Sequence, residues 1–190
     1  MQVGVKLVGV EQATRRLAAI GSNIDPVMRG ALNTTATKTR TDRYVRPMAG
    51  SIKGRRLRGA LKIRRANRRY TNARIIPSSS GILVLNYQGW GYDEISPTRA
   101  RIWVRGPNGR KVAAGFVNPS SKHKLPLATR SNRAAKNKTY SYQRGLQPAQ
   151  GPSAAYWFKQ LTNGQTIRWV NAFLQQEFEK RIRREIDKRS

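Results

Sequence analysis

The stretch KGRRLRGALKIRRANRRYTNAR, residues 53–74, contains ten Lys or Arg residues and no Asp or Glu. Apolar residues at 52, 57, 61 and 63 accompany these charges, which favours a folded element over a polybasic tail. Cations at this density repel one another, so we expect them to point outward and to contact an anion. The candidate anion-contact residues are Lys53, Arg55, Arg56, Arg58, Lys62, Arg64, Arg65, Arg68, Arg69 and Arg74.

The rest of the chain does not neutralise this stretch. The whole chain of 190 residues contains 38 Lys and Arg against 9 Asp and Glu, which gives a formal net charge of +29. Between residues 95 and 176 there are 14 Lys or Arg and no acidic side chain. A solvated basic helix is the simpler interpretation of a single charge run. The uncompensated excess instead favours a phosphate backbone or an acidic protein surface as partner.

Length and composition predict one domain over residues 1–190, with 118–151 as an extended loop or arm within it. Hydrophobic residues make up 38% of the chain, enough for a core. The absence of Cys excludes disulfides and Cys-ligated metal. No signal-peptide pattern, lipidation signal or run of roughly 20 apolar residues occurs, so we expect an unprocessed soluble protein without a membrane partner.

Three elements are predicted before the basic stretch. Alternating apolar residues indicate a short strand at 3–7. Apolar residues three or four apart predict a helix over 10–20. A second helix is expected over 26–45, with Asp25 as its N-terminal cap and an end at Arg46-Pro47.

The secondary structure of the basic stretch itself is left open by its residue spacing. Ser51 is placed to cap a short helix from Ile52, and the run from Leu61 fits either a helix or a first strand. Residues 74–76 and 82–87 flank a Pro-Ser-Ser-Ser-Gly turn and are predicted to pair as antiparallel strands.

A second hairpin is the most specific local prediction. Residues 101–105 and 111–117 flank Gly106-Pro107-Asn108-Gly109, in which Asn-Gly suits the positive φ angles of a tight turn.

The long excursion over 118–151 has an ordered anchor at 125–127 and a flexible arm at 131–150. A long closing helix over 167–186 has apolar residues along one face. The predicted fold class is α+β: N-terminal helices and a long C-terminal helix packed on a small, mainly antiparallel sheet.

No catalytic constellation is recognisable. His123 lies between two lysines, without partners for a metal site or a catalytic base. Asp93 and Glu94 are adjacent, but neighbours in sequence often point apart, and we interpret them as a loop acid pair that offsets local Arg. No nucleotide-binding loop, nucleophile elbow or zinc-protease motif occurs. We therefore expect no enzyme activity, no catalytic or metal-binding residue and no cofactor.

Several aromatic residues lie near basic ones. Stacking on bases is one interpretation of Trp90, Tyr92 and Trp103. Without a zinc-finger, KH or RRM signature, core packing is favoured for Trp103. Subunit contacts are the favoured role for Tyr156, Trp157, Phe158, Trp169 and Phe173.

The order of these parts resembles the minor tail protein Z family of tailed bacteriophages. The resemblance covers most of the chain, although the arm over 130–155 is longer than the family pattern. It is carried by the helix containing Arg29 to Ala36, the Arg-rich run 52–69, the strand pair around 73–85, the hairpin 102–117, the element Lys124 to Leu127 and the basic helix that reaches Ser190.

The resemblance implies a structural virion protein, the tail-completion or neck component at the head-tail joint. It would form a homo-oligomeric ring whose basic surfaces face tail-tube, tail-terminator or connector proteins and the genome end. Its location would be the virion tail, and the host cytoplasm during assembly. Two alternatives explain the charge as well: a ribosomal or chromatin-like nucleic-acid binder, and a basic assembly factor that contacts only acidic proteins.

Overall fold

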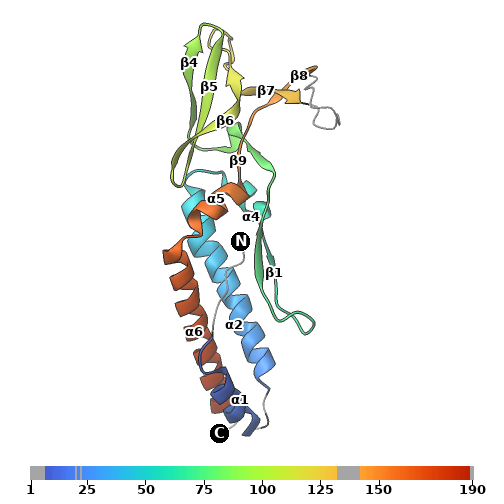
Figure 1. Cartoon of the computed structure of the whole chain (residues 1–190), viewed down its shortest axis with the longest axis vertical. Helices are drawn as coiled ribbons and strands as arrows, with labels where there is room; N and C mark the ends of the chain where they lie inside the picture. The colour runs from blue at the N-terminus through green and yellow to red at the C-terminus, as the bar shows by residue number, and fades with distance from the viewer. Residues whose placement is uncertain (1–6, 20, 22, 132–141, 189–190) are drawn as a thin grey trace. The chain divides into compact units, whose positions relative to one another are not determined.

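The computed structural model describes residues 7–19, 21, 23–131 and 142–188. It confirms the α+β class, with helices at both ends of the chain and antiparallel strands between them (Figure 1). The chain divides into two compact units: unit 1 contains residues 1–46, 61–77 and 158–190, and unit 2 contains 47–60 and 78–157. Each unit is described separately below, and the expectation of a single domain stays a prediction.

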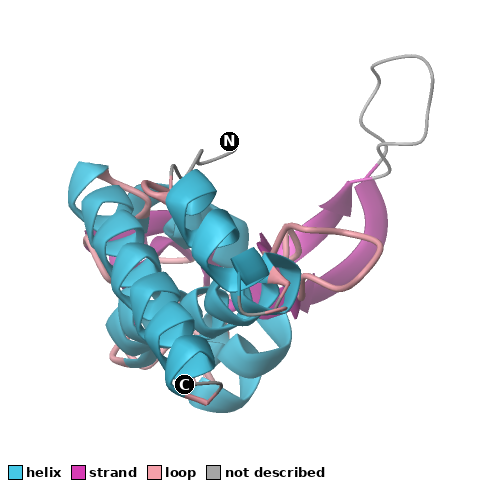
Figure 2. Cartoon of the chain, turned by 90° about the horizontal axis from the view of Figure 1, so that it is seen from below, coloured by secondary structure: helices cyan, strands magenta, loops and turns pink. Residues whose placement is uncertain are grey.

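Unit 1 is built on three helices: α1 (Val10–Ala19), α2 (Ile24–Thr39) and α6 (Gly164–Asp187). They lie side by side (Figures 1 and 2). Their shared core is formed by Ala13, Leu17, Val27, Ala31, Leu174 and Phe178. The apolar spacing that predicted the first and last helices therefore describes real buried faces. Most of the predicted strand at 3–7 lies outside the described residues, and Leu7 is not in a strand.

The N-terminal cap of α2 is Asn23, and the prediction of Asp25 is wrong. Asn23 has extended backbone angles, and its side-chain oxygen accepts a hydrogen bond from the Asp25 amide at 2.8 Å. Asp25 lies in the first helical turn, where a carboxylate is favoured by the helix dipole. Asn163 caps α6 in the same way, accepting from the Thr166 amide at 2.9 Å.

The second helix does not end at Arg46-Pro47. A π-helical turn, η1 (Arg40–Val45), follows α2, and α3 (Arg46–Ala49) follows η1. In the wider turn the Arg46 amide bonds to the Thr41 carbonyl, five residues earlier. The wider turn lies directly before Pro47, which has no amide hydrogen and displaces the carbonyl four residues earlier.

The run from Leu61 begins with a strand. β1 (Leu61–Arg64) and β2 (Arg74–Pro77) form a two-stranded antiparallel sheet in unit 1. The predicted pairing of residues 74–76 with 82–87 is therefore wrong. β3 (Gly81–Leu83) instead pairs with β9, and the 3₁₀ turn η2 (Val84–Asn86) follows it.

Unit 2 contains a seven-stranded antiparallel sheet. Its main path runs β3-β9-β6-β5-β4, and β7 pairs with β6 and β8. The remaining strands are β4 (Trp90–Ser96), β5 (Arg99–Gly106), β6 (Gly109–Val117), β7 (Leu127–Ser131), β8 (Tyr142–Pro148) and β9 (Gln150–Ser153).

The predicted hairpin around Gly106-Pro107-Asn108-Gly109 is confirmed as β5–β6, with Gly106 paired to Gly109. Gly109 has φ +103°, whereas Asn108 does not have a positive φ. Of the Asn-Gly pair, only Gly109 therefore adopts the positive φ angle that the motif predicts, a conformation that glycine reaches without steric cost.

The interpretation of 118–151 as one extended loop is wrong. β7, β8 and the first two residues of β9 lie within it, and the central residues 132–141 are outside the described part. β7 and β8 pair antiparallel from Leu127↔Pro148 to Ser131↔Tyr142. Cross-strand pairing thus orders a stretch whose composition favours loops.

The core of unit 2 gathers around Tyr87 and Trp157, which are 2% exposed each. The Trp157 indole donates to the Tyr87 hydroxyl at 2.9 Å, and that hydroxyl donates to the Pro152 carbonyl at 2.6 Å. Gly106 lies against the Trp157 ring, where a Cβ would overlap it. Burial raises the pKa of Tyr87 to about 12, and the hydrogen bond from Trp157 opposes the shift.

The short helix in the basic stretch is α4 (Gly54–Ala60), which starts later than predicted. Ser51 and Ile52 are buried before it, and Ile52 forms an isolated antiparallel bridge with Tyr87. Leu57 is the buried residue of α4. Within the described residues no helix is long and apolar enough to span a bilayer.

α5 (Ala154–Leu161) precedes α6. In unit 1, the Phe158 ring stacks on Tyr44 at a centroid distance of 4.1 Å, and the hydroxyls of Tyr44 and Thr162 share a hydrogen bond of 3.1 Å. Burial raises the pKa of Tyr44, against the opposing effects of Thr162 and Arg43.

Candidate anion-binding site

All ten predicted anion-contact residues are exposed, but they belong to two different units. Unit 2 carries Lys53, Arg55, Arg56 and Arg58, in or next to α4. Unit 1 carries the other six on the segment 61–77, called here the basic hairpin: Lys62, Arg64, Arg65, Arg68, Arg69 and Arg74.

The two faces of the basic hairpin differ in character because side chains alternate along each strand. Leu61 is fully buried, and Ile63 and Ile75, which pair across the strands, are half-buried. On the other face Lys62 and Arg64 are exposed. One face therefore holds the hairpin to the unit, and the other presents its charges to solvent.

Arg64 lies directly opposite Arg74 in the register of the hairpin. Like charges at directly opposed positions destabilise a strand pair. In the described part of the chain, no ion pair within 4.0 Å involves the six hairpin cations. An external anion between Arg64 and Arg74 would remove this repulsion, which makes the pair the best-defined anion position on the hairpin.

The tip of the hairpin is a tight turn organised by Asn67. Its side-chain oxygen accepts hydrogen bonds from the amides of Arg69 at 2.9 Å and Tyr70 at 2.8 Å. The Asn67 amide in turn donates to the Tyr70 carbonyl at 2.8 Å. Arg68 and Arg69 are consequently carried at the outermost bend of the segment.

Tyr70 adds an aromatic surface to the site. The Arg64 guanidinium carbon lies 5.0 Å from the Tyr70 ring centroid, within cation–π range. Tyr70 remains 45% exposed. The tip thus combines a positioned cation with an accessible ring.

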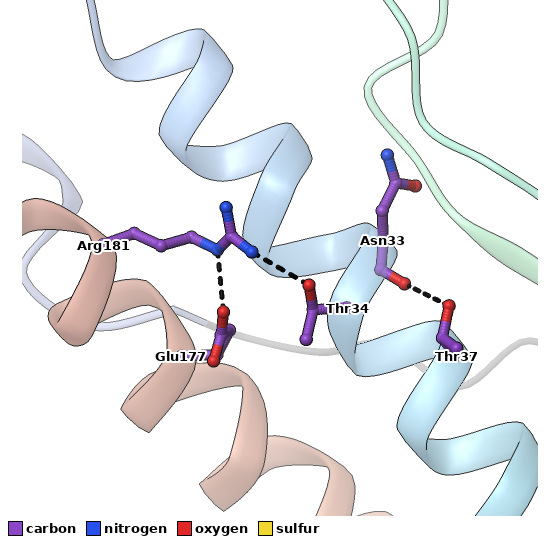
Figure 3. Close-up of polar contacts among 5 residues, drawn as sticks. All are labelled: Asn33, Thr34, Thr37, Glu177 and Arg181. Atoms are coloured by element: carbon purple, nitrogen blue, oxygen red, sulfur yellow. Dashed lines mark hydrogen bonds and ion pairs between the residues drawn. The ribbon is translucent and has the colours of Figure 1, made fainter.

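Asn33 of α2 holds the hairpin to the helices of unit 1. Its Oδ1 accepts from the amide of buried Ala66 at 2.8 Å, and its Nδ2 donates to the Ala66 carbonyl at 3.0 Å. Figure 3 shows this side chain on α2 directed toward the hairpin ribbon, away from Arg181. Sequence reasoning did not assign Asn33 a role at the site. The available signal is its position in mid-helix, where Asn is a poor helix former.

The aromatic residues predicted as subunit contacts have different environments. Trp157 is buried in unit 2, so the prediction that it contacts another subunit is wrong. Tyr156 is half-buried, with the Lys111 ammonium 5.5 Å from its ring. Phe158 is half-buried against Tyr44.

Trp169 and Phe173 of α6 stack on each other at a centroid distance of 5.2 Å, and both remain half-exposed. Arg43 lies over the Trp169 ring at 5.8 Å. These two residues stay candidates for a subunit contact. Trp103, predicted to be in the core, instead lies on an exposed face of β5, because the buried residues of that strand are at the alternate positions.

Asp93 and Glu94 do not form a carboxylate pair. They are consecutive residues of β4, not of a loop, so their side chains point to opposite faces. His123 is exposed in the segment between β6 and β7. Among the described residues no group of three or more His, Cys, Asp or Glu is placed to hold a metal ion.

Comparison of the chain with known protein families, curated proteins and solved structures found no match.

Proposed function

We propose that this protein is a structural virion component, the tail-completion or neck protein of a long-tailed bacteriophage. It assembles as a ring at the head-tail joint, and its basic hairpin binds acidic partner proteins or the genome end. The place in a phage tail rests on the sequence resemblance described above. The polyanion-binding role rests on the hairpin itself.

The observation that carries this role is the arrangement of charge on residues 61–77. Six exposed cations lie on one small element, two of them directly opposed, and the described ion pairs are formed by other residues. A fold that only needed a soluble surface would not gain from placing Arg64 opposite Arg74. A polyanion offsets this repulsion and releases its own counterions on binding.

The helices of unit 1 suit the structural part of the proposal. α2 and α6 pack along an apolar seam and fix Asn33, which in turn fixes the hairpin. The half-exposed Trp169 and Phe173 on α6 offer an aromatic contact for a neighbouring subunit.

The test is the mass of the purified protein at moderate and high salt, alone and mixed with tail tubes or connectors. A ring, or a monomer that assembles only on these particles, is the expected result. The matched variant Arg64→Gln/Arg74→Gln should lose particle binding at moderate salt and keep its fold. A monomer that ignores tail particles at every salt concentration contradicts the neck assignment.

The second candidate function is that of a nucleic-acid-binding protein of the ribosomal or chromatin-like kind. Its supporting observation is the tip of the hairpin, where Arg64 and the exposed ring of Tyr70 are close enough to hold a phosphate and a base together. Tight binding of short duplexes or RNA by the monomer, without affinity for tail particles, would select this function.

A further inference from the structure

β4, β5 and β6 lie side by side in unit 2 (Figure 1). A second charged surface lies on the exposed face of these three strands. On β5 the buried positions are Ala100, Ile102 and Val104, so the residues between them point outward. Directly paired residues share a face, so this surface also takes in Gly91 and Phe116, which pair with Trp103 and Arg101. We use the name outer sheet face for six of its residues: Asp93, Arg101, Trp103, Arg105, Arg110 and Val112.

Trp103 is held at the centre of this face by three neighbours. Its indole nitrogen donates to Asp93 Oδ1 at 3.2 Å. The ring lies against Gly91, where a Cβ would overlap it. The Arg110 guanidinium carbon lies 3.8 Å from the ring centroid, which fixes the planar cation over the indole.

Asp93 is one carboxylate among the three arginines of this face, so their charge is only partly offset. Arg105 and Arg110 are directly opposed across β5 and β6. Arg101 is opposite Asp93, whose Oδ1 accepts the Trp103 hydrogen bond. In the part of the chain that the structure describes, no ion pair within 4.0 Å includes any of these three arginines.

The face also exposes apolar surface. Val112, which pairs with Trp103, is 57% exposed, although it lies in mid-strand. Arg and Trp around an exposed apolar residue match the composition of protein interfaces, where aromatic residues and Arg are enriched.

We propose that the outer sheet face binds an acidic protein surface, with carboxylates bound by Arg101, Arg105 and Arg110 and apolar side chains packed on Trp103 and Val112. A stacked guanidinium keeps its N–H edge free for bidentate binding of a carboxylate. A second copy of the same face does not fit, because its three arginines would meet the three arginines of the first.

A nucleic acid fits less well than an acidic protein. The Trp103 face that Arg110 covers is not available for stacking on a base, and Asp93 places a negative charge among the arginines. This surface is distinct from the basic hairpin, so the inference stands independently of the proposed function.

The experiment uses the full chain with its four tryptophans labelled by 5-fluorotryptophan and observed by ¹⁹F NMR. The Trp103 signal is assigned with Trp103→Phe, and the signal of buried Trp157 reports on the fold. The probe is poly-L-glutamate at moderate salt, compared with a short DNA duplex at equal charge concentration.

Poly-L-glutamate is expected to shift the Trp103 signal and leave the Trp157 signal in place. In Arg101→Gln/Arg110→Gln, the apparent affinity for poly-L-glutamate, measured from the Trp103 shift, should fall at least about tenfold. Each charge-assisted hydrogen bond contributes roughly that factor to affinity. The matched control Lys180→Gln/Arg183→Gln removes the same charge from exposed positions of α6 and should change the apparent affinity less than about twofold.

Three results would overturn the proposal. The first is no Trp103 shift with poly-L-glutamate, and the second is an equal loss of affinity in the α6 control. The third is a Trp103 shift that needs less DNA than poly-L-glutamate, which would assign the face to nucleic acid.

Discussion

Gly30 of α2 leaves the space in which the guanidinium of Arg181 lies. A Cβ at residue 30 would stand 2.9 Å from Arg181 Cζ and closer still to Nη1. From this position Arg181 donates through Nη2 to Thr34 Oγ1 at 2.9 Å and through Nε to Glu177 Oε1 at 2.8 Å (Figure 3). The glycine thus permits a polar link between α2 and α6 next to their apolar seam.

Gly30→Ala should therefore change the free energy of unfolding very little. Ala gains about 1 kcal/mol of helix propensity over Gly, and displacement of Arg181 loses about as much in hydrogen bonding. In an Arg181→Ala background the same substitution should stabilise the protein by about 1 kcal/mol. Urea unfolding of the four proteins of this cycle measures the coupling. Additive effects, within about 0.3 kcal/mol, would show that the two residues do not interact.

Asn33→Ala should loosen the basic hairpin. It removes both hydrogen bonds to Ala66, and we expect a loss of about 1–3 kcal/mol because the Ala66 backbone is buried. Hydrogen exchange at the Ala66 amide should accelerate together with the drop in urea stability. Thr37→Ala is the control: its exposed hydroxyl donates to the Asn33 carbonyl, and its effect should stay within about 0.5 kcal/mol.

Arg74→Gln separates hairpin stability from hairpin binding. Removing one of two opposed cations should raise stability at low salt by a few tenths of a kcal/mol. If Arg74 binds a phosphate, the same change should weaken duplex DNA binding and lower the slope of log K against log salt by about 0.9. Arg183→Gln, an exposed change of equal charge on α6, should leave that slope intact. An unaltered slope in Arg74→Gln would exclude the residue from the phosphate contacts.

Tyr87 predicts an alkaline loss of stability. The pKa of its hydroxyl is ordinarily 10.0 and is raised to about 12 in the folded protein. Between these pH values the folded protein therefore keeps the Tyr87 proton, whereas the unfolded chain has lost it. The stabilising effect is fully present below pH 10 and is lost as the pH rises from 10 to 12. Between pH 10 and 12 the free energy of unfolding should therefore fall more steeply for the wild-type protein than for Tyr87→Phe. Parallel curves would refute the assignment. The comparison cancels the titration of the lysines.

Turn motifs and apolar spacing in the sequence correctly predicted helices and a hairpin formed by residues close together in the chain. The β5–β6 hairpin follows from Gly106-Pro107-Asn108-Gly109, and α1 and α6 follow from the spacing of apolar residues. The partner of β2 was not predictable in this way. Its apolar residues fit any neighbouring strand, and the choice of β1 depends on burial of Leu61 and Ile63. Pairing of β3 with β9 joins residues far apart in the sequence, for which no local signal exists.

The exposure of the ten cations was predictable, because Lys and Arg are rarely buried without a partner. Their division between two units was not, since the unit boundary between Ala60 and Leu61 falls inside an uninterrupted basic run. The register that opposes Arg64 to Arg74 and the contact of Asn33 with Ala66 depend on tertiary packing. Composition indicates which charges are available, and the fold decides which of them act together.

The attachment of the hairpin through Asn33 uses a neutral amide, whereas the candidate anion-binding groups on the hairpin are all charged. Salt screens interactions between exposed charges and has little effect on a contact between two neutral groups, such as the part-buried one between the Asn33 amide and the Ala66 backbone. Rising ionic strength should thus release a polyanionic partner while the hairpin stays in place on α2. Dissociation then leaves a folded element ready to rebind, which gives a reversible contact rather than one that must refold at each encounter.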